Sequence, residues 1–187
     1  IIILNYLPNI MYILLFTICL AASAYHIRFL PGSFVKKDTY ENFLEGLQNR
    51  LQTESLEYMS YISLPCYPPN TILVGHSFGG SIALLQSQCC HENIDAIIIM
   101  NCHLNVKEQM PYFPIPFEKV KNKVAVLYCK EDQQLPYNMV QIDCDEAEKK
   151  GIDSIQFKCF SGDHFSLFLE QNNTKNAIDY IESFIKN

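Results

Sequence analysis

The sequence lacks the patterns that mark cofactor-dependent and nucleic-acid-binding proteins. It contains no cluster of metal-ligating residues, no phosphate-binding glycine loop and no dinucleotide-binding fingerprint. The net charge is −6, and lysines such as Lys119, Lys121 and Lys123 are scattered among acidic groups, which leaves no basic face for a phosphate backbone. We therefore expect a protein that requires no cofactor and no metal and that does not bind nucleic acid.

Internal repeats, low-complexity linkers and paired cysteines are also missing. Charged residues make up 18% of the 187 residues and hydrophobic residues 49%, which excludes a disordered or fibrous chain and is typical of one globular domain. The eight cysteines show no C-x-x-C or zinc-type spacing, so we expect reduced, buried thiols. Cys102 and Cys129 end two consecutive predicted strands and are the two that could lie near each other.

No charged residue precedes Arg28, and the chain starts with Ile1, which leaves open that its amino end is incomplete. Residues 11–24 form an apolar stretch of secretory-signal length without a basic residue ahead of it, and a full membrane span fits poorly. We favour a buried element of the fold over a signal or anchor in residues 1–24. A cytoplasmic location is accordingly favoured over a secreted or membrane-anchored one.

From Tyr25 onward, strand-like and helix-like patterns alternate, which indicates parallel strands joined by helical crossovers. Helices are predicted after a capping-box-like pair, Asp38 and Glu41, over residues 81–90, between Pro136 and Gly151, and at the carboxyl terminus. We therefore predict an α/β fold with a mostly parallel central sheet of about six strands flanked by helices. The predicted strands cover residues 26–30, 56–63, 71–74, 95–100, 124–129 and 155–160.

Two of these strands carry positional information. Residues 155–160 alternate between apolar and polar side chains, which is typical of a strand at a sheet edge. Residues 56–63 and 71–74 are separated by a segment too short for the helical crossover that adjacent parallel strands require. Either the first segment is not a sheet strand, or it pairs antiparallel.

The sequence Gly75-His76-Ser77-Phe78-Gly79 stands between an apolar strand and an amphipathic segment, the layout of a nucleophile elbow. At such a turn the serine has a strained backbone, and the two glycines leave room for the strand and helix to pack closely. Ser77 would then be exposed at the carboxyl edge of a parallel sheet. The alternative is a glycine-rich turn with an idle serine.

A serine hydroxyl needs a histidine base and a carboxylate that orients it. Asp132 and His164 each follow a predicted strand, so parallel strands would bring both to the edge that carries Ser77. Glu131 is the alternative acid, whereas Asp163 is badly placed to reach the ring of its own neighbour. The other histidines are less suitable: His76 belongs to the elbow, His26 lies in a strand, and His91 and His103 lie in polar loops or strand ends.

The chain resembles the α/β-hydrolase superfamily from about Tyr25 to its carboxyl terminus. The resemblance rests on GHSFGG at residues 75–80, on Asp132 with Pro136 four residues later, and on Gly162-Asp163-His164 before the last helix. It implies a compact hydrolase domain over residues 25–187 with little or no lid. It also implies Ser77 as nucleophile, Asp132 as orienting acid and His164 as general base.

An acyl-transfer intermediate needs backbone donors for its oxyanion. We expect one from Phe78, directly after the nucleophile, and one from Ser33 or Phe34 in the loop after the first strand, where family members often carry His-Gly. The short interval 102–123 contains apolar residues that could rim an acyl pocket or be ordinary packing, namely Met110, Tyr112, Phe113, Pro114, Ile115 and Phe117.

The sequence thus predicts a serine hydrolase that cleaves a small carboxylic ester or thioester through an acyl-enzyme. The alternative is a hydrolase-shaped protein that binds a small apolar ligand with little turnover. The expected partner is a small-molecule ester or acyl compound, and contact with a membrane would involve only the amino-terminal segment.

Overall fold

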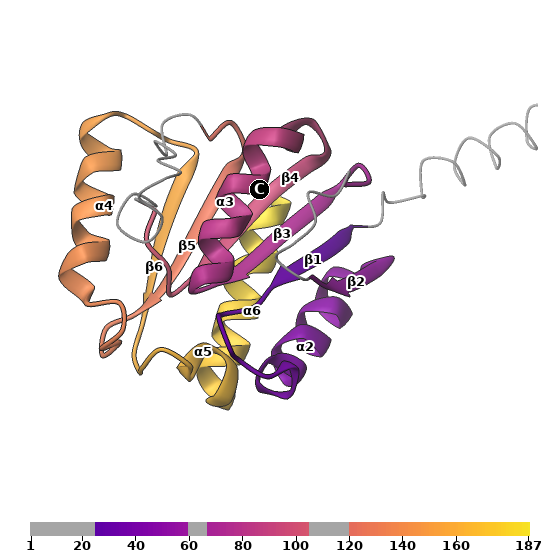
Figure 1. Ribbon diagram of the computed structural model, residues 1–187, viewed down its shortest axis with the longest axis horizontal. Coiled ribbons are helices and arrows are strands. Elements are labelled where there is room, and N and C mark those ends of the chain that lie inside the picture. Colours follow the sequence, from indigo (N-terminus) through magenta and orange to yellow (C-terminus); the bar gives the residue numbers. More distant parts are fainter. Residues whose placement is uncertain (1–24, 60–66, 105–119) are drawn as a thin grey trace, which may run out of the picture.

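The computed structural model describes residues 25–59, 67–104 and 120–187, which form a six-stranded sheet in the order β2-β1-β3-β4-β5-β6. Every neighbouring pair of strands is parallel, so all six strands end at one edge of the sheet. Figure 1 shows the strands side by side with the helices around them. The strands are β1 His26–Leu30, β2 Ser55–Tyr58, β3 Thr71–His76, β4 Ile94–Met100, β5 Lys123–Cys129 and β6 Ile155–Phe160.

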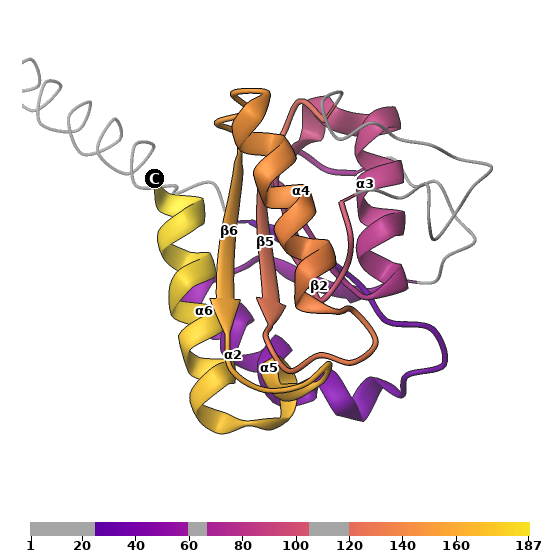
Figure 2. The same ribbon diagram turned by 90° about the vertical axis from the view of Figure 1, so that its left-hand side faces the viewer.

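Helices cover both faces of the sheet (Figure 2). One face carries α2 (Glu41–Leu51), α5 (Ser166–Leu169) and α6 (Gln171–Lys186), and the other carries α3 (Phe78–Cys90) and α4 (Tyr137–Lys149). Two short 3-10 turns, Lys37–Tyr40 and His91–Asn93, complete the described elements. The predicted fold class, a mostly parallel sheet between helical layers, is confirmed.

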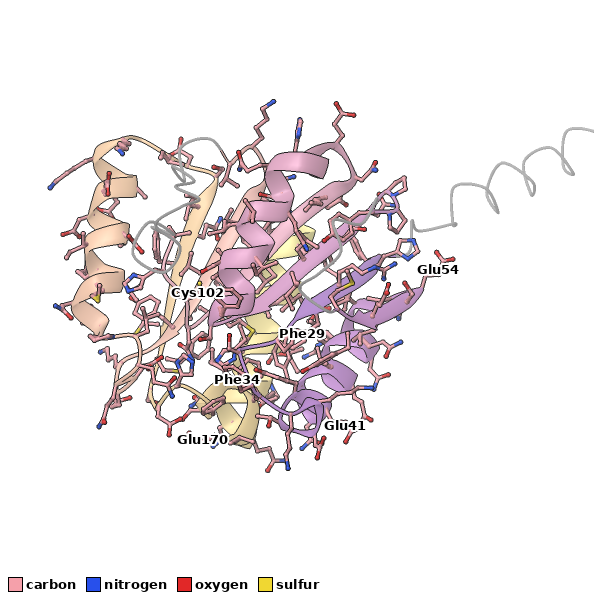
Figure 3. All side chains as sticks on the ribbon, viewed as in Figure 1. Phe29, Phe34, Glu41, Glu54, Cys102 and Glu170 are labelled. Carbon is pink, nitrogen blue, oxygen red and sulfur yellow. The ribbon has the colours of Figure 1, made fainter. Side chains whose placement is uncertain are left out.

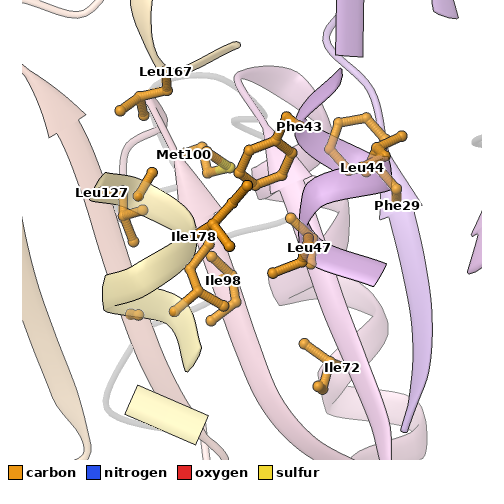
Figure 4. Close-up of a cluster of buried hydrophobic side chains, with 14 of the residues drawn as sticks. Phe29, Phe43, Leu44, Leu47, Ile72, Ile98, Met100, Leu127, Leu167 and Ile178 are labelled. Carbon is orange, nitrogen blue, oxygen red and sulfur yellow. The ribbon is translucent and has the colours of Figure 1, made fainter. Parts of the chain in front are cut away.

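The central strands are apolar throughout because both of their faces are buried. Along β4, Ile98 and Met100 join the core under α2 and α6, whereas Ile97 and Ile99 join the core under α3 and α4. Figure 4 shows the first of these cores, with Phe43 and Leu47 of α2 facing Ile72, Ile98 and Leu127 of the sheet. Burial of this kind stabilises the folded state by roughly 1.5–3 kcal/mol for each large side chain. The carboxyl ends of the strands are thereby held in fixed positions.

Both expectations for the second predicted strand are wrong. Strand β2 is a sheet strand and pairs parallel with β1, with Leu56 opposite Ile27. Helix α2 provides the crossover between β1 and β2, and β1 lies between β2 and β3 in the sheet. The short connection from β2 to β3 therefore does not join neighbouring strands, and the crossover-length rule did not apply to it.

The predicted capping box is also wrong, although the helix behind it is present. Asp38 lies inside the 3-10 turn Lys37–Tyr40, and Tyr40 occupies the cap position of α2 without a side-chain capping bond. The extra 3-10 turn thus moves the start of α2 beyond the reach of Asp38. The helix packs on the sheet through its buried residues Phe43, Leu44, Leu47 and Leu51.

The edge position of β6 agrees with the sequence, and the expectation of reduced, buried thiols is met in part. Strand β6 ends the sheet order and exposes Gln156 and Lys158. Four cysteines among the described side chains are free: Cys102 and Cys129 are buried, whereas Cys144 and Cys159 are partly exposed. Burial raises the pKa of Cys102 and of Cys129 to about 12. The amino-terminal segment 1–24 and the apolar candidates between Met110 and Phe117 lie outside the described residues. Within the described ranges, none of the helices has both the length and the apolar composition that a membrane span requires.

Candidate active site

Ser77 alone joins β3 to α3, since β3 ends at His76 and α3 begins at Phe78. Its backbone has φ 53° and ψ −125°, a region that residues with a side chain rarely adopt. The turn is held by two hydrogen bonds: the Ser77 N–H donates to the Met100 carbonyl at 2.9 Å, and the Ser77 carbonyl accepts from the Gly80 N–H at 2.9 Å. The predicted strained strand-to-helix turn is therefore present, with a partly exposed serine at its tip.

The two glycines that flank Ser77 are required by close backbone contacts. A Cβ atom at Gly75 would lie 2.5 Å from the carbonyl oxygen of Gly79. A Cβ atom at Gly79 would overlap the carbonyl oxygens of Leu30 and Pro31, at the end of β1. These glycines thus let the first turn of α3 pack directly against β3 and against the loop after β1, as the sequence predicts.

Gly79→Ala is expected to lower the free energy of unfolding by about 3 kcal/mol, because backbone rather than a flexible side chain occupies the space. Gly151→Ala is the matched control. Its φ of +63° is unfavourable for alanine, but nothing lies within 4 Å of the new Cβ, so about 1 kcal/mol should be lost. Urea unfolding measures both; equal losses would contradict the proposed close packing at Gly79.

Asp132 and His164 form a buried pair at the carboxyl edge. The Nδ1 atom of His164 lies 2.6 Å from Oδ2 of Asp132, and the side chains are 7% and 1% exposed. The second carboxylate oxygen of Asp132 accepts the N–H groups of Gln134 at 2.8 Å and Leu135 at 2.9 Å. These bonds hold the carboxylate in one orientation, so it accepts the Nδ1–H of His164 and leaves Nε2 as the basic nitrogen.

The other two carboxylates near His164 have different partners. Glu131 accepts a hydrogen bond from the Gly162 N–H. Asp163 accepts the Phe165 N–H at 2.9 Å and the Ser166 hydroxyl at 3.0 Å, and the bond from Phe165 is the main reason that its pKa is lowered. Asp132 is thus the carboxylate that contacts the His164 ring.

The hydroxyl of Ser77 and the ring of His164 share no hydrogen bond in the described part of the chain, so the structure brings together two of the three predicted residues directly. The link to the serine runs through its neighbour: His76 Nε2 lies 3.1 Å from the carbonyl oxygen of His164. The two imidazole rings are 4.6 Å apart between centroids. Catalytic hydrogen bonds are often long before substrate binds and tighten in the complex.

Two buried residues that the sequence reading did not assign to the site also hold His164. The Asn101 amide donates to the His164 carbonyl at 2.9 Å, and its oxygen accepts the Cys129 N–H at 2.9 Å. His76 is completely buried and contacts Tyr40 as well as His164. The signal for Asn101 was a polar residue directly after an apolar strand; its φ of 46° could not be read from the sequence.

His103 lies just after the end of β4, as expected, but it is buried rather than exposed to solvent. The residue is 6% exposed, and its Nδ1 atom lies 3.4 Å from Oδ2 of Asp143 on α4. The same carboxylate oxygen accepts the Leu104 N–H at 2.9 Å. This second histidine–aspartate pair anchors the chain after β4 to α4, a contact between distant segments that residue spacing does not reveal.

The protonation of His76 should be visible in the pH dependence of stability. Burial, and then the charge of His164, lowers the pKa of His76 from 6.5 to about 3, although the nearby Asp132 charge acts in the opposite direction. Between these pH values the unfolded chain binds a proton that the folded protein does not, so stability is lost as the pH falls below 6.5. His76 alone should then lower the free energy of unfolding by about 2 kcal/mol when the pH falls from 7.5 to 5.

Urea unfolding at these two pH values measures the effect as a difference between variants. His76→Gln removes the titrating group and should lose less stability on acidification than the wild type. His91→Gln, at a partly exposed histidine, should retain the wild-type dependence. Equal pH dependence in the wild type and His76→Gln would contradict a neutral, buried His76.

The predicted oxyanion donors lie at the expected ends of elements. Phe78 is the first residue of α3, where backbone N–H groups point out of the helix. Ser33 and Phe34 occupy an exposed turn after β1, with Phe34 at φ 61° and its side chain in solvent (Figure 3). The backbone N–H groups of Ser33 and Phe34 donate to no other described residue, whereas the Gly32 N–H donates to the Tyr40 hydroxyl at 2.9 Å. Ser33 and Phe34 therefore remain the candidates for the second donor.

A groove between α2 and α6, with a volume of about 680 Å³, is separate from these residues. Arg50 in this groove pairs with Asp179 and with Glu182, and Lys175 pairs with Asp179. Its charges are thus neutralised within the protein, and none of its lining residues is a predicted site residue. The described residues also include no group of three or more histidine, cysteine or acidic side chains arranged to hold a metal ion.

A parallel sheet between helical layers, with a strained serine turn after its third strand in chain order, defines the chain as an α/β hydrolase. Solved structures with this fold cover 84–88% of the chain, at identities of 12–17% that show the fold alone. A family model described as phospholipase/carboxylesterase matches residues 39–185. The chain belongs to this family and is a hydrolase. No curated protein matches it in sequence.

Three solved structures illustrate the similarity. A YdeN-like hydrolase from Pectobacterium atrosepticum has a TM-score of 0.65 at 13% identity and covers 88% of this chain and 92% of its own. Alpha/beta hydrolase domain-containing protein 10 from mouse has a TM-score of 0.62 at 17% identity, covering 86% and 89%. The fluorophosphonate-binding serine hydrolase F of Staphylococcus aureus has a TM-score of 0.60 at 12% identity, covering 85% and 84%.

Proposed function

We propose that the protein is a serine hydrolase that cleaves a carboxylic ester through an acyl-enzyme on Ser77. The observation that carries the proposal is the buried hydrogen bond of 2.6 Å between His164 and Asp132, at the sheet edge where the strained Ser77 turn lies. A histidine oriented by a buried carboxylate is the base that a serine hydroxyl requires. The family membership of the chain supports the same chemistry.

The proposed reaction has two halves. His164 Nε2 takes the proton of Ser77 as its oxygen attacks the ester carbonyl, and the same proton then goes to the leaving alcohol. In the second half His164 takes a proton from the water whose oxygen attacks the acyl-enzyme, and it returns this proton to Ser77 Oγ as the acid is released. Asp132 stays ionised throughout, holds the ring by Nδ1–H and stabilises the imidazolium.

Negative charge that develops on the ester carbonyl needs fixed donors. The Phe78 N–H at the start of α3 and the N–H of Ser33 or Phe34 are the proposed pair, each worth roughly 3 kcal/mol in the transition state. The close contact between Gly79 and the carbonyl oxygens of Leu30 and Pro31 keeps the start of α3 against the loop that carries the second donor. This contact ties the start of α3, which carries the first proposed donor, to the end of β1 that leads into the loop with the second.

A small carboxylic ester is the proposed substrate, with a thioester as the variant that the same chemistry would cleave. The family description, phospholipase/carboxylesterase, supports ester chemistry. A fluorophosphonate-binding serine hydrolase among the structures of similar fold is consistent with an activated serine, although the likeness itself concerns the fold.

Active-site labelling and ester hydrolysis test the proposal together. We expect the purified protein to react with a fluorophosphonate probe and to hydrolyse p-nitrophenyl esters, compared from acetate to octanoate. His164→Ala should abolish both reactions, since the serine loses its base. A protein that binds an apolar ligand without turnover would show neither labelling nor hydrolysis in the wild type, and that result would reject the serine hydrolase.

A further inference from the structure

A chain of three buried hydrogen bonds joins the loop after β1, the elbow and the segment that carries the general base. The Gly32 N–H donates to the Tyr40 hydroxyl at 2.9 Å, and this hydroxyl lies 2.9 Å from Nδ1 of His76. Nε2 of His76 lies 3.1 Å from the carbonyl oxygen of His164. Tyr40 and His76 are both completely buried. The chain therefore runs from the residue beside the proposed oxyanion donors to the backbone of His164.

The acceptor at one end of the chain fixes the direction of its hydrogen bonds. A carbonyl oxygen only accepts, so His76 must carry its proton on Nε2. Nδ1 of a neutral His76 is then an acceptor, and the Tyr40 hydroxyl donates to it while accepting the Gly32 N–H. The lowered pKa of His76, caused mainly by its burial, agrees with the neutral ring.

The polar groups of this chain are surrounded by aromatic rings. Phe168 makes edge contacts with Tyr40 at 4.8 Å and with His76 at 4.8 Å between ring centroids. An apolar residue at position 76 would fill such a space without the cost of burying two nitrogens. The hydrogen bonds consequently determine the positions of Gly32, Tyr40 and His164 relative to His76, which packing alone would leave adjustable.

We propose that Tyr40 and His76 are positioning residues. Their hydrogen bonds hold the loop after β1, which carries Ser33 and Phe34, and the backbone of His164 in fixed positions relative to Ser77. The inference rests on the proposed function and adds residues to it that do not touch the substrate. The Asn101 amide donates to the same carbonyl at 2.9 Å and so helps to hold it. Because His76 directly precedes Ser77, a shift of its ring would move the nucleophile relative to its base.

Tyr40→Phe tests the role with the least change in shape. It removes only the hydroxyl, and we expect kcat for p-nitrophenyl butyrate to fall about 10- to 100-fold, with KM within about threefold of the wild type. Tyr67→Phe is the matched control, since it removes a buried hydroxyl that donates to Gln86 outside the proposed site. This control should lose comparable stability but keep kcat within about twofold. Equal kcat values for Tyr40→Phe and the wild type would overturn the inference.

Substitutions of His76 separate hydrogen bonding from packing. His76→Gln retains one donor and one acceptor, whereas His76→Phe retains an aromatic ring without either. We expect kcat of the glutamine variant to exceed that of the phenylalanine variant by about tenfold. The glutamine can keep the hydrogen bonds that position Ser77 and His164, whereas the phenylalanine cannot. A phenylalanine variant as active as the glutamine variant, or more active, would overturn the inference. If His76→Phe does not fold, the comparison of Tyr40→Phe with Tyr67→Phe tests the inference.

The proton position on His76 gives a reading that does not depend on activity. Imidazole ¹⁵N chemical shifts, assigned by comparison with His76→Gln, should show the Nε2–H tautomer, and the Nδ1–H tautomer would overturn the inferred direction. Ser77→Ala, assayed in parallel, separates the two proposals. If Ser77→Ala keeps the wild-type turnover, the proposed function fails. If Ser77→Ala is inactive while Tyr40→Phe turns over like the wild type, the positioning role alone fails.

Discussion

Ser77→Ala is expected to lower kcat/KM for p-nitrophenyl butyrate by at least about 10,000-fold, because the variant has no oxygen that can form the acyl-enzyme. The remaining fold, the His164–Asp132 pair and the backbone donors should be unchanged, since the Ser77 side chain makes no hydrogen bond with another described residue that the fold would lose. Hydrolysis measured by p-nitrophenol release, with circular dichroism to check folding, gives the comparison. Activity within tenfold of the wild type would exclude Ser77 as the nucleophile.

Ser87→Ala is the control on the same helix. Its buried hydroxyl donates to the Leu84 carbonyl at 2.7 Å, on a part of α3 beyond the elbow, and its loss should leave kcat/KM unchanged. Ser77→Gly adds a stability reading, since glycine adopts the backbone angles of position 77 without strain. We expect it to raise the free energy of unfolding by about 1 kcal/mol over Ser77→Ala. An unstrained turn would show no such gain.

Asp132→Asn is expected to lower kcat by about 1,000- to 10,000-fold. Asp132 now accepts the His164 Nδ1–H with one oxygen and two backbone N–H groups with the other. An asparagine whose oxygen stays with the backbone donors would offer its NH₂ group to Nδ1, so that His164 carries its proton on Nε2 and cannot accept one from Ser77. The pH dependence of kcat and a fluorophosphonate labelling rate measure the loss.

Glu131→Gln provides the comparison, because Glu131 is the neighbouring acid that the sequence could not exclude. Its carboxylate accepts the Gly162 N–H, and a glutamine oxygen can accept the same bond. We expect kcat within about threefold of the wild type. A larger loss in Glu131→Gln than in Asp132→Asn would reverse the assignment of the orienting acid.

Features with a local cause were predictable from the sequence. The apolar strands around β4, the glycines at positions 75 and 79, and the alternation in β6 each follow from burial or close contact of the same few residues. The meeting of Asp132 and His164 followed from one topological rule, that parallel strands end at the same edge. These were sufficient for the fold class and for the contact between Asp132 and His164.

Features that depend on the order of strands were not predictable in this way. The parallel pairing of β2 follows from the insertion of β1 between β2 and β3, which no spacing in the sequence specifies. The contacts of His76 with Tyr40 and His164 join residues 36 and 88 positions apart. A histidine inside a serine motif and a tyrosine just before an apolar helix have ordinary local explanations, so only the folded arrangement reveals their contact.

In the proposed reaction Ser77 carries the acyl group during turnover. Mass spectrometry of the protein quenched during hydrolysis of p-nitrophenyl butyrate, followed by peptide mapping, tests it directly. We predict one added butyryl group, on the peptide that contains Ser77. Ester hydrolysis with the butyryl group on another residue, or with no covalent intermediate and full activity in Ser77→Ala, would contradict the account.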